Sequence, residues 1–170
     1  MFYGYKCFDK GLINRYGTKF EVGKLYHTDN EIKFGNDGNG FHVCKRLEDT
    51  LRYFDAMNGE VDIAKVKCYG NYQKYEDEYN DYYEMYAFEY MIIDKVLTRE
   101  EIINYGIHLY EMQVKRFISG FRLTKEEIIM FKEQFKKNQN ILNTIAYYQE
   151  GDKEVFNRQY TKKRKHDIIK

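Results

Sequence analysis

The stretch that organises the chain reads Gly35-Asn36-Asp37-Gly38-Asn39-Gly40-Phe41-His42-Val43-Cys44. It predicts a glycine-rich turn that leads directly into a short apolar strand, because Asn, Asp and Gly tolerate left-handed backbone angles. Alternation along that strand places His42 and Cys44 on one face and the two apolar residues on the other. We expect the His42 side chain to anchor the turn by hydrogen bonding to the backbone of the turn. The candidate ligand site is therefore Gly40, Phe41, His42 and Cys44.

Alternating apolar residues on both sides of this turn predict further strands, and a helical period predicts one helix. The expected helix is Leu47 to Met57, closed by Asn58-Gly59. Gly23 indicates a bulge or turn within the expected strand Lys19 to Tyr26, and Gly70 should end the expected strand Val61 to Tyr69. The expected strands are Tyr3 to Phe8, Lys19 to Tyr26, Glu31 to Phe34, Phe41 to Cys44, Val61 to Tyr69 and Met85 to Ile93.

The last third of the chain contains an internal repeat. Leu97 to Tyr105 matches Leu123 to Phe131 at an offset of 26 residues. Each copy opens with a capping box, in which a threonine pairs with the glutamate three positions later. A second helix should follow in each copy, from about Glu111 to Ser119 and from about Asn138 to Gln149. The repeat thus predicts two helical hairpins.

These patterns together predict an α+β fold, with an N-terminal, mostly antiparallel sheet and one helix, followed by C-terminal helical hairpin repeats. The expected organisation is an α+β domain over residues 1–95, a helical-repeat region over 97–151, and a basic C-terminal helix or tail over 152–170.

Composition restricts the function classes. The 170 residues carry 28 basic and 27 acidic side chains, and a net charge of +1 argues against a general nucleic-acid binder. No apolar run could cross a membrane, and Met1-Phe2-Tyr3-Gly4 does not resemble a signal peptide, so we expect a cytoplasmic protein. Three cysteines without CxxC spacing indicate reduced thiols. The 18 tyrosines and 12 phenylalanines fit either AT-rich codon usage or a tyrosine-rich binding surface.

Two reactive chemistries could use His42 and Cys44. A structural zinc site needs four ligands, and no other His or Cys pair has ligand spacing. A Cys–His nucleophile pair would need an orienting group and an oxyanion site, and neither is visible. The turn also lacks both glycine-rich nucleotide motifs. We therefore assign no catalytic residue, and we expect no metal and no cofactor.

Two charged segments are candidate contact surfaces. The acidic tyrosine block could bind a protein or a ribonucleoprotein, since tyrosine is a frequent interface anchor. The basic tail could contact nucleic-acid phosphates. The block consists of Tyr72, Tyr75, Glu76, Asp77, Glu78, Tyr79, Asp81, Tyr82, Tyr83 and Glu84, and the tail residues are Lys162, Lys163, Arg164 and Lys165.

The N-terminal motifs resemble an uncharacterised domain of phage and bacterial mobile-element proteins over about residues 3–95. They are Tyr5-Lys6-x-Phe8, Phe20-Glu21-Val22-Gly23-Lys24-x-Tyr26 and Gly40-Phe41-His42-x-Cys44. Cys7 stands where that pattern has glycine, and the cysteine expected before Gly40 is missing. The resemblance implies a small cytosolic protein, phage-encoded, and carries no known chemistry.

Three functions follow as hypotheses. The first is a protein that binds and modulates a host macromolecule, for example an inhibitor of a nuclease-based defence system such as CRISPR. The second rests on a distant similarity to ADP-ribosyltransferase folds, which implies NAD binding near Gly40 to His42, with Glu60 or Glu89 as the acid. The third is a nucleic-acid-binding protein that uses the basic tail. The oligomeric state is left open.

Overall fold

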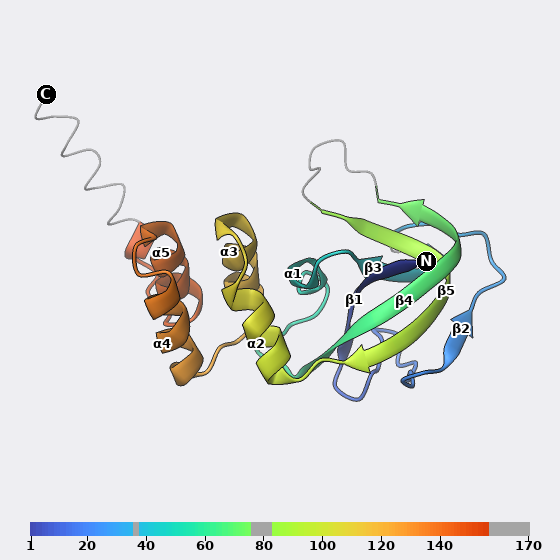
Figure 1. Ribbon diagram of the computed structural model, residues 1–170, viewed down its shortest axis with the longest axis horizontal. Coiled ribbons are helices and arrows are strands. Elements are labelled where there is room, and N and C mark those ends of the chain that lie inside the picture. Colours follow the sequence, from blue (N-terminus) through green and yellow to red (C-terminus); the bar gives the residue numbers. More distant parts are fainter. Residues whose placement is uncertain (36–37, 76–82, 157–170) are drawn as a thin grey trace, which may run out of the picture. The chain divides into compact units, whose positions relative to one another are not determined.

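The computed structural model describes residues 1–35, 38–75 and 83–156, and the chain divides into two compact units, Met1–Ile102 and the part from Ile103 onward. Figure 1 shows the elements of each unit. Their bounds are β1 Phe2–Asp9, β2 Leu25–His27, β3 Phe41–Cys44, α1 Leu47–Thr50, β4 Val61–Lys74, β5 Met85–Val96, α2 Arg99–Ile107, α3 Glu111–Gly120, α4 Lys125–Gln134 and α5 Gln139–Tyr148.

The first unit is built on a five-stranded antiparallel sheet in the order β2-β5-β3-β1-β4. Because β5 also pairs with β4, strands β4, β1, β3 and β5 close into a small four-stranded barrel, as the long curved pair β4 and β5 makes visible (Figure 1). Two register shifts in the β4–β5 pairing, at Lys65/Val66 and Tyr69/Tyr72, supply the bend that closure requires.

The core of this unit is rich in aromatic and branched side chains. Phe8, Val43 and Met91 come from different strands and are almost fully buried. Phe8 packs on Phe20 with ring centroids 5.5 Å apart, and Phe20 packs on Tyr26 at 4.6 Å. The loop between β1 and β2, which holds Phe20, is therefore fixed against the barrel by aromatic contacts.

Several expected elements are shorter or longer in the structure. Only Leu47–Thr50 is helical, because the Asp55 carboxylate accepts hydrogen bonds from the N–H groups of Met57 and Asn58 and forms a competing turn. Glu31 to Phe34 forms no strand. Strand β4 continues through Gly70, whose φ of +83° lies at the second register shift and not at a strand end.

Between Lys19 and Tyr26 the expected long strand is wrong. Only β2 forms, joined by isolated bridges at Lys19 and Val22. Gly23 has a φ of +80° and donates its N–H to the carbonyl of Ile93. The expectation of a bulge or turn at Gly23 is confirmed, and this turn interrupts the strand.

Four helices, α2 to α5, follow the sheet where the sequence predicts two helices in each copy of the repeat, and α2 begins within the first unit. Both capping boxes are confirmed: Thr98 and Glu101 exchange hydrogen bonds of 3.0 and 3.2 Å, and Thr124 and Glu127 exchange bonds of 2.8 and 3.2 Å. Helices α3 and α5 pack together. Gln149 bridges this packing, since its Nε2 donates to the carbonyl of Ile118 at 2.6 Å.

The architecture is mixed α+β, with N-terminal antiparallel strands and a short helix followed by four helices, which confirms the expected fold class. No helix in the described ranges is long and apolar enough to cross a membrane.

Candidate functional site

The glycine-rich turn is held by His42, as the sequence predicts. The backbone N–H of Gly35 donates a 3.2 Å hydrogen bond to Nε2 of His42. Gly35 and Gly40 have φ angles of +131° and +106°, so both need glycine. Gly38 needs glycine for a different reason: a Cβ there would lie 2.0 Å from the Lys33 carbonyl oxygen. Two residues of the turn, Asn36 and Asp37, lie outside the described ranges.

Burial lowers the pKa of His42 to about 4, and the neighbouring positive charge of Lys6 acts in the same direction. The imidazole is therefore neutral at physiological pH. A neutral ring has one nitrogen that accepts, and Nε2 uses that lone pair on Gly35. His42 thus has a structural role at the edge of the site.

The three cysteine thiols, Cys7, Cys44 and Cys68, are all buried and free. Burial raises the pKa of each to about 12, so none forms a thiolate near neutral pH. Within the described ranges no group of three or more His, Cys, Asp or Glu side chains could hold a metal ion. The geometry therefore gives no support to nucleophilic or zinc chemistry at Cys44.

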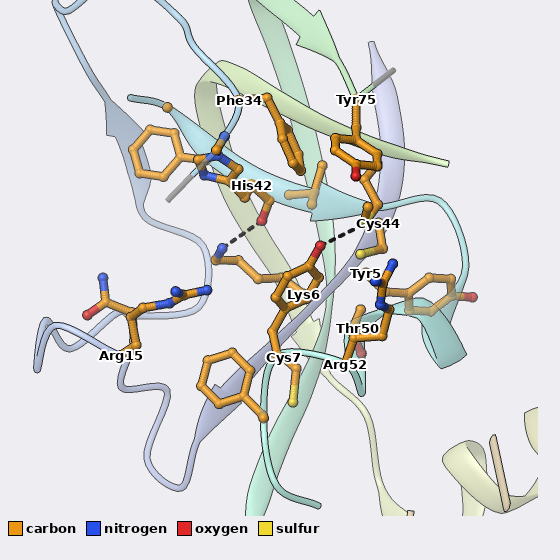
Figure 2. Close-up of a pocket in the computed structure, with 18 of the residues that line it drawn as sticks. Tyr5, Lys6, Cys7, Arg15, Phe34, His42, Cys44, Thr50, Arg52 and Tyr75 are labelled. Atoms are coloured by element: carbon orange, nitrogen blue, oxygen red, sulfur yellow. Dashed lines mark hydrogen bonds between the residues drawn. The ribbon is translucent and has the colours of Figure 1, made fainter. Parts of the chain in front are cut away.

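A cavity of about 920 Å³ opens in the first unit beside His42, and it is lined by polar and aromatic side chains from β1, β3, β4 and the loops around them. Figure 2 shows part of this lining. All four residues of the predicted ligand site, Gly40, Phe41, His42 and Cys44, line it. The structure therefore brings these four residues to one wall of a cavity.

Four cationic side chains line the same cavity: Lys6, Arg15, Arg52 and Lys74. Among the described lining residues none is an aspartate or a glutamate. Nor does any of the four cations form an ion pair with a carboxylate of the described chain. Among the described lining residues the formal charge is therefore positive, and such a lining suits an anionic group.

Lys6 is the least exposed of these four residues. Its Nζ donates a 2.6 Å hydrogen bond to the backbone carbonyl of His42, drawn as a dashed line in Figure 2. The same nitrogen lies 5.7 Å from the centroid of the Phe8 ring. Burial lowers the pKa of Lys6 to about 8. The Lys6 ammonium group is thus partly removed from water, and it interacts with the carbonyl dipole of His42 and the face of the Phe8 ring.

The two arginines flank Lys6 from opposite sides in the close-up (Figure 2). The Arg52 guanidinium carbon lies 3.9 Å from the centroid of the Tyr83 ring, and that of Arg15 lies 5.9 Å from the Tyr16 ring. Contact with an aromatic face orients a guanidinium, whose N–H donors point outward in the guanidinium's own plane.

Aromatic rings form another wall of the cavity. Phe34 meets the His42 ring edge-on at 4.7 Å and the Tyr75 ring at 4.9 Å. The backbone N–H of Phe34 donates a 2.5 Å hydrogen bond to Oε1 of Gln73, which ties this segment to β4. These rings offer a flat apolar surface beside the cations, suited to a planar group.

The acidic tyrosine block is divided by the structure. Tyr72 and Tyr75 line the cavity, and Tyr72 lies on β4. Tyr83 stacks on Arg52, and the Glu84 carboxylate accepts a 3.0 Å hydrogen bond from the Tyr86 hydroxyl. The remaining members, Glu76, Asp77, Glu78, Tyr79, Asp81 and Tyr82, lie outside the described ranges, as do the tail residues Lys162, Lys163, Arg164 and Lys165.

Sequence reasoning missed the cations. Lys6 stands in a strand with apolar neighbours, Cys7 and Phe8, and a lysine in such a position is the one signal that points to a pocket. Arg15 and Arg52 come from loops, and nothing in their local sequence relates them to each other. Their convergence depends on the tertiary fold.

A comparison with known protein families shows to which family this chain belongs. A family described as a domain of unknown function, DUF7666, matches residues 2–103, and since this is more than half of the chain, the protein belongs to that family. Comparisons with curated proteins and with solved structures gave no match. The matched region contains the whole of the barrel and the cavity.

Proposed function

We propose that the first unit is a binding module for a small anionic ligand that carries a planar ring, such as a nucleotide. The observation that carries the proposal is the cavity of about 920 Å³, in which four cations and no described acid face the ligand space beside aromatic rings. That volume lies within the range of small-molecule sites. The cations supply charge-assisted hydrogen bonds to phosphate oxygens, and the rings of Phe34 and Tyr75 supply a stacking surface.

Calorimetric titration of the full-length chain with ADP tests this proposal, with adenosine and pyrophosphate as partial ligands. Arg52→Met and Arg15→Met should each weaken ADP binding about tenfold or more, because a hydrogen bond to a charged group contributes about 1.5–3 kcal/mol. Lys137→Met removes one exposed charge in the second unit and is the matched control. Raising the salt concentration should also weaken binding.

The proposal fails if neither ADP nor pyrophosphate binds to the folded protein. It fails equally if Lys137→Met weakens binding as much as the two arginine variants do. Binding of adenosine as tight as that of ADP would remove the role given to the cations.

A second candidate function is binding of a protein or ribonucleoprotein partner. The observation that favours it is a set of exposed tyrosines among the cavity-lining residues: Tyr16, Tyr53 and Tyr72 are 72, 42 and 63% exposed. Exposed tyrosines are frequent interface anchors. In this proposal the chain modulates a host macromolecule, for instance as an inhibitor of a nuclease-based defence system, and the resemblance to phage and mobile-element proteins supports that context.

A pull-down from host lysate separates the two candidates. Wild-type protein and a Tyr16→Ser, Tyr53→Ser, Tyr72→Ser variant are compared, with Tyr110→Ser as the control, since Tyr110 is 84% exposed and belongs to the second unit. A stoichiometric partner lost only in the triple variant supports the macromolecular candidate. If the triple variant and Tyr110→Ser recover the same host proteins in equal amounts, the result counts against this candidate.

For the NAD-dependent alternative, the cavity supports NAD binding, but it gives no support to catalysis by the candidate acids. Gly40 to His42, where the similarity to ADP-ribosyltransferase folds implies NAD binding, line the cavity. Neither Glu60 nor Glu89 lines it, and the Glu89 carboxylate instead accepts a hydrogen bond from the N–H of Asn71. NAD is therefore added to the titration series as one more ring-bearing anion. Nucleic-acid binding through the tail rests on residues outside the described ranges.

A further inference from the structure

We propose that Lys6 is a covalent attachment site, whose amine forms an imine with the aldehyde group of an anionic ligand held in the cavity. This inference rests on the proposed function, since the cations must first bring the ligand to Lys6. It adds a chemical step and a ligand class, the anionic aldehydes, to what would otherwise be reversible binding.

Lys6 is one of the residues that line the cavity, and its Nζ has a defined orientation there. Its contacts are the 2.6 Å hydrogen bond to the His42 carbonyl and the ring of Phe8 at 5.7 Å. In Figure 2 the Lys6 side chain runs into the space between His42 and Arg15. One N–H is directed by the carbonyl, and the part-buried Lys6 side chain is part of the cavity lining. The nitrogen is thus held in a fixed orientation on a residue of the cavity wall.

The electrostatic environment favours the uncharged amine. Burial lowers the pKa of Lys6 to about 8, and the positive charge of Arg15 acts in the same direction. The thiols of Cys7, Cys44 and Cys68 are protonated near neutral pH, so they supply no negative charge that would restore the ammonium form. At pH 8 roughly half of Lys6 is a free amine, against about one part in 300 for an ordinary lysine. A desolvated lysine beside other cations is a recognised form of activated amine nucleophile.

The step balances without any further reactant. The lone pair on Nζ attacks the aldehyde carbon and forms a C–N bond, while the carbonyl π electrons move to oxygen. Proton transfer from nitrogen to that oxygen gives a carbinolamine, and loss of water leaves the C=N bond. No atom is oxidised or reduced, and hydrolysis reverses the reaction.

Trapping with borohydride tests the inference. The full-length chain is incubated with pyridoxal 5′-phosphate, an anionic aromatic aldehyde, at less than one equivalent, then reduced, and the adduct is mapped by mass spectrometry. We expect a single adduct at Lys6 that forms at least tenfold faster than adducts at the exposed Lys125 and Lys137. Pyridoxal, which lacks the phosphate, should label Lys6 more slowly. Pyridoxine 5′-phosphate, which lacks the aldehyde, should slow the labelling by competition.

Two controls keep the result interpretable. Lys6→Arg should abolish the adduct while Lys137→Arg labels as the wild type does, with circular dichroism to check folding. If Lys6→Arg does not fold, the pH profile of labelling in the wild-type protein decides instead. The Lys6 rate should level off above about pH 8, as its pKa requires, whereas an ordinary lysine rate would still rise towards pH 10.5.

The outcomes separate this inference from the proposed function. ADP binding without preferential labelling of Lys6 would overturn the imine and leave the binding module intact. Labelling of Lys6 without ADP binding would support the imine and overturn the nucleotide-like ligand. Labelling spread evenly over exposed lysines, with no ADP binding, would overturn both.

Discussion

Gly35 and His42 are joined by a 3.2 Å hydrogen bond from the glycine N–H to the imidazole Nε2. The bond closes the glycine-rich turn and fixes the position of His42, whose carbonyl oxygen in turn accepts the Lys6 Nζ hydrogen bond. His42 therefore connects the geometry of the turn to Lys6, the least exposed of the four cations that line the cavity.

Protonation of His42 should destabilise the first unit. Its pKa in the folded protein, about 4, lies below the ordinary value of 6.5, so the unfolded chain takes up the proton first as the pH falls. Stability is unaffected above pH 6.5 and declines between pH 6.5 and 4, by on the order of 2–3 kcal/mol. Urea unfolding of the wild type and His42→Gln from pH 7.5 to 4.5 measures this slope.

The glutamine variant should flatten that profile, because its amide can accept the Gly35 bond and does not titrate in this range. His108→Gln, which removes an exposed histidine of the second unit, should keep the wild-type slope. An unchanged slope in His42→Gln would show that other groups produce the pH dependence.

The three thiols should resist alkylation in the folded protein. Cys7, Cys44 and Cys68 are each at most 5% exposed, and burial raises the pKa of each to about 12. Iodoacetamide requires the thiolate, so modification should follow global unfolding and increase with urea. Mass spectrometry of pulse-labelled protein measures the rate at each cysteine. Rapid labelling of Cys44 in the absence of urea would restore it as a reactive residue of the cavity wall.

The fold class could be predicted from sequence, because it depends on local signals. The capping boxes at Thr98 and Thr124 and the His42 anchor rest on neighbours within a few residues, and all three are present. Element lengths were less predictable. The Asp55 side chain competes with the helix after Thr50, which a helical period does not reveal.

The cavity depends on contacts that no local pattern encodes. Lys6 and Arg52 are 46 positions apart, and they line the same cavity because β1 pairs with β3 and α1 packs on both strands. The predicted ligand residues Gly40 to Cys44 do reach this cavity. They form one wall, and the four cationic residues that also line the cavity come from other parts of the chain.

Asp62 should be a larger source of stability than its ion pair suggests. Its Oδ2 accepts hydrogen bonds from the N–H groups of Gly11 and Leu12 at 2.7 and 3.1 Å, and its Oδ1 lies 2.9 Å from Lys10 Nζ. These bonds hold Leu12 in the left-handed region, at a φ of +59°. Asp62→Asn should cost about 1–3 kcal/mol of unfolding free energy, because buried donors lose a charged acceptor.

Lys10→Met should cost less than about 1 kcal/mol, since the lysine side chain is 65% exposed. The pKa of Asp62 is lowered by the Lys10, Gly11 and Leu12 hydrogen bonds, which together outweigh the opposing effect of burial. Its contribution is therefore present above the ordinary pKa of 3.8 and is lost as the pH falls below it. Equal losses in Asp62→Asn and Lys10→Met would indicate that the ion pair, and not the backbone bonds, stabilises this loop.

Gly106→Ala should destabilise the second unit although alanine is the better helix former. A Cβ at Gly106 would lie 2.5 Å from one carbon of the Phe117 ring and 2.7 and 2.8 Å from two others. Phe117 is fully buried and stacks on Phe121 and Phe131, so the ring has little room to move. Overpacking costs about 1–3 kcal/mol, which exceeds the roughly 1 kcal/mol gained in helix propensity.

Thermal unfolding of Gly106→Ala, Phe117→Leu and the double variant gives the coupling between the two positions. The double variant should be more stable than the sum of the single losses predicts, because leucine leaves space for the new methyl group. Additive losses would mean that the helix adjusts elsewhere and that Gly106 is not required by Phe117.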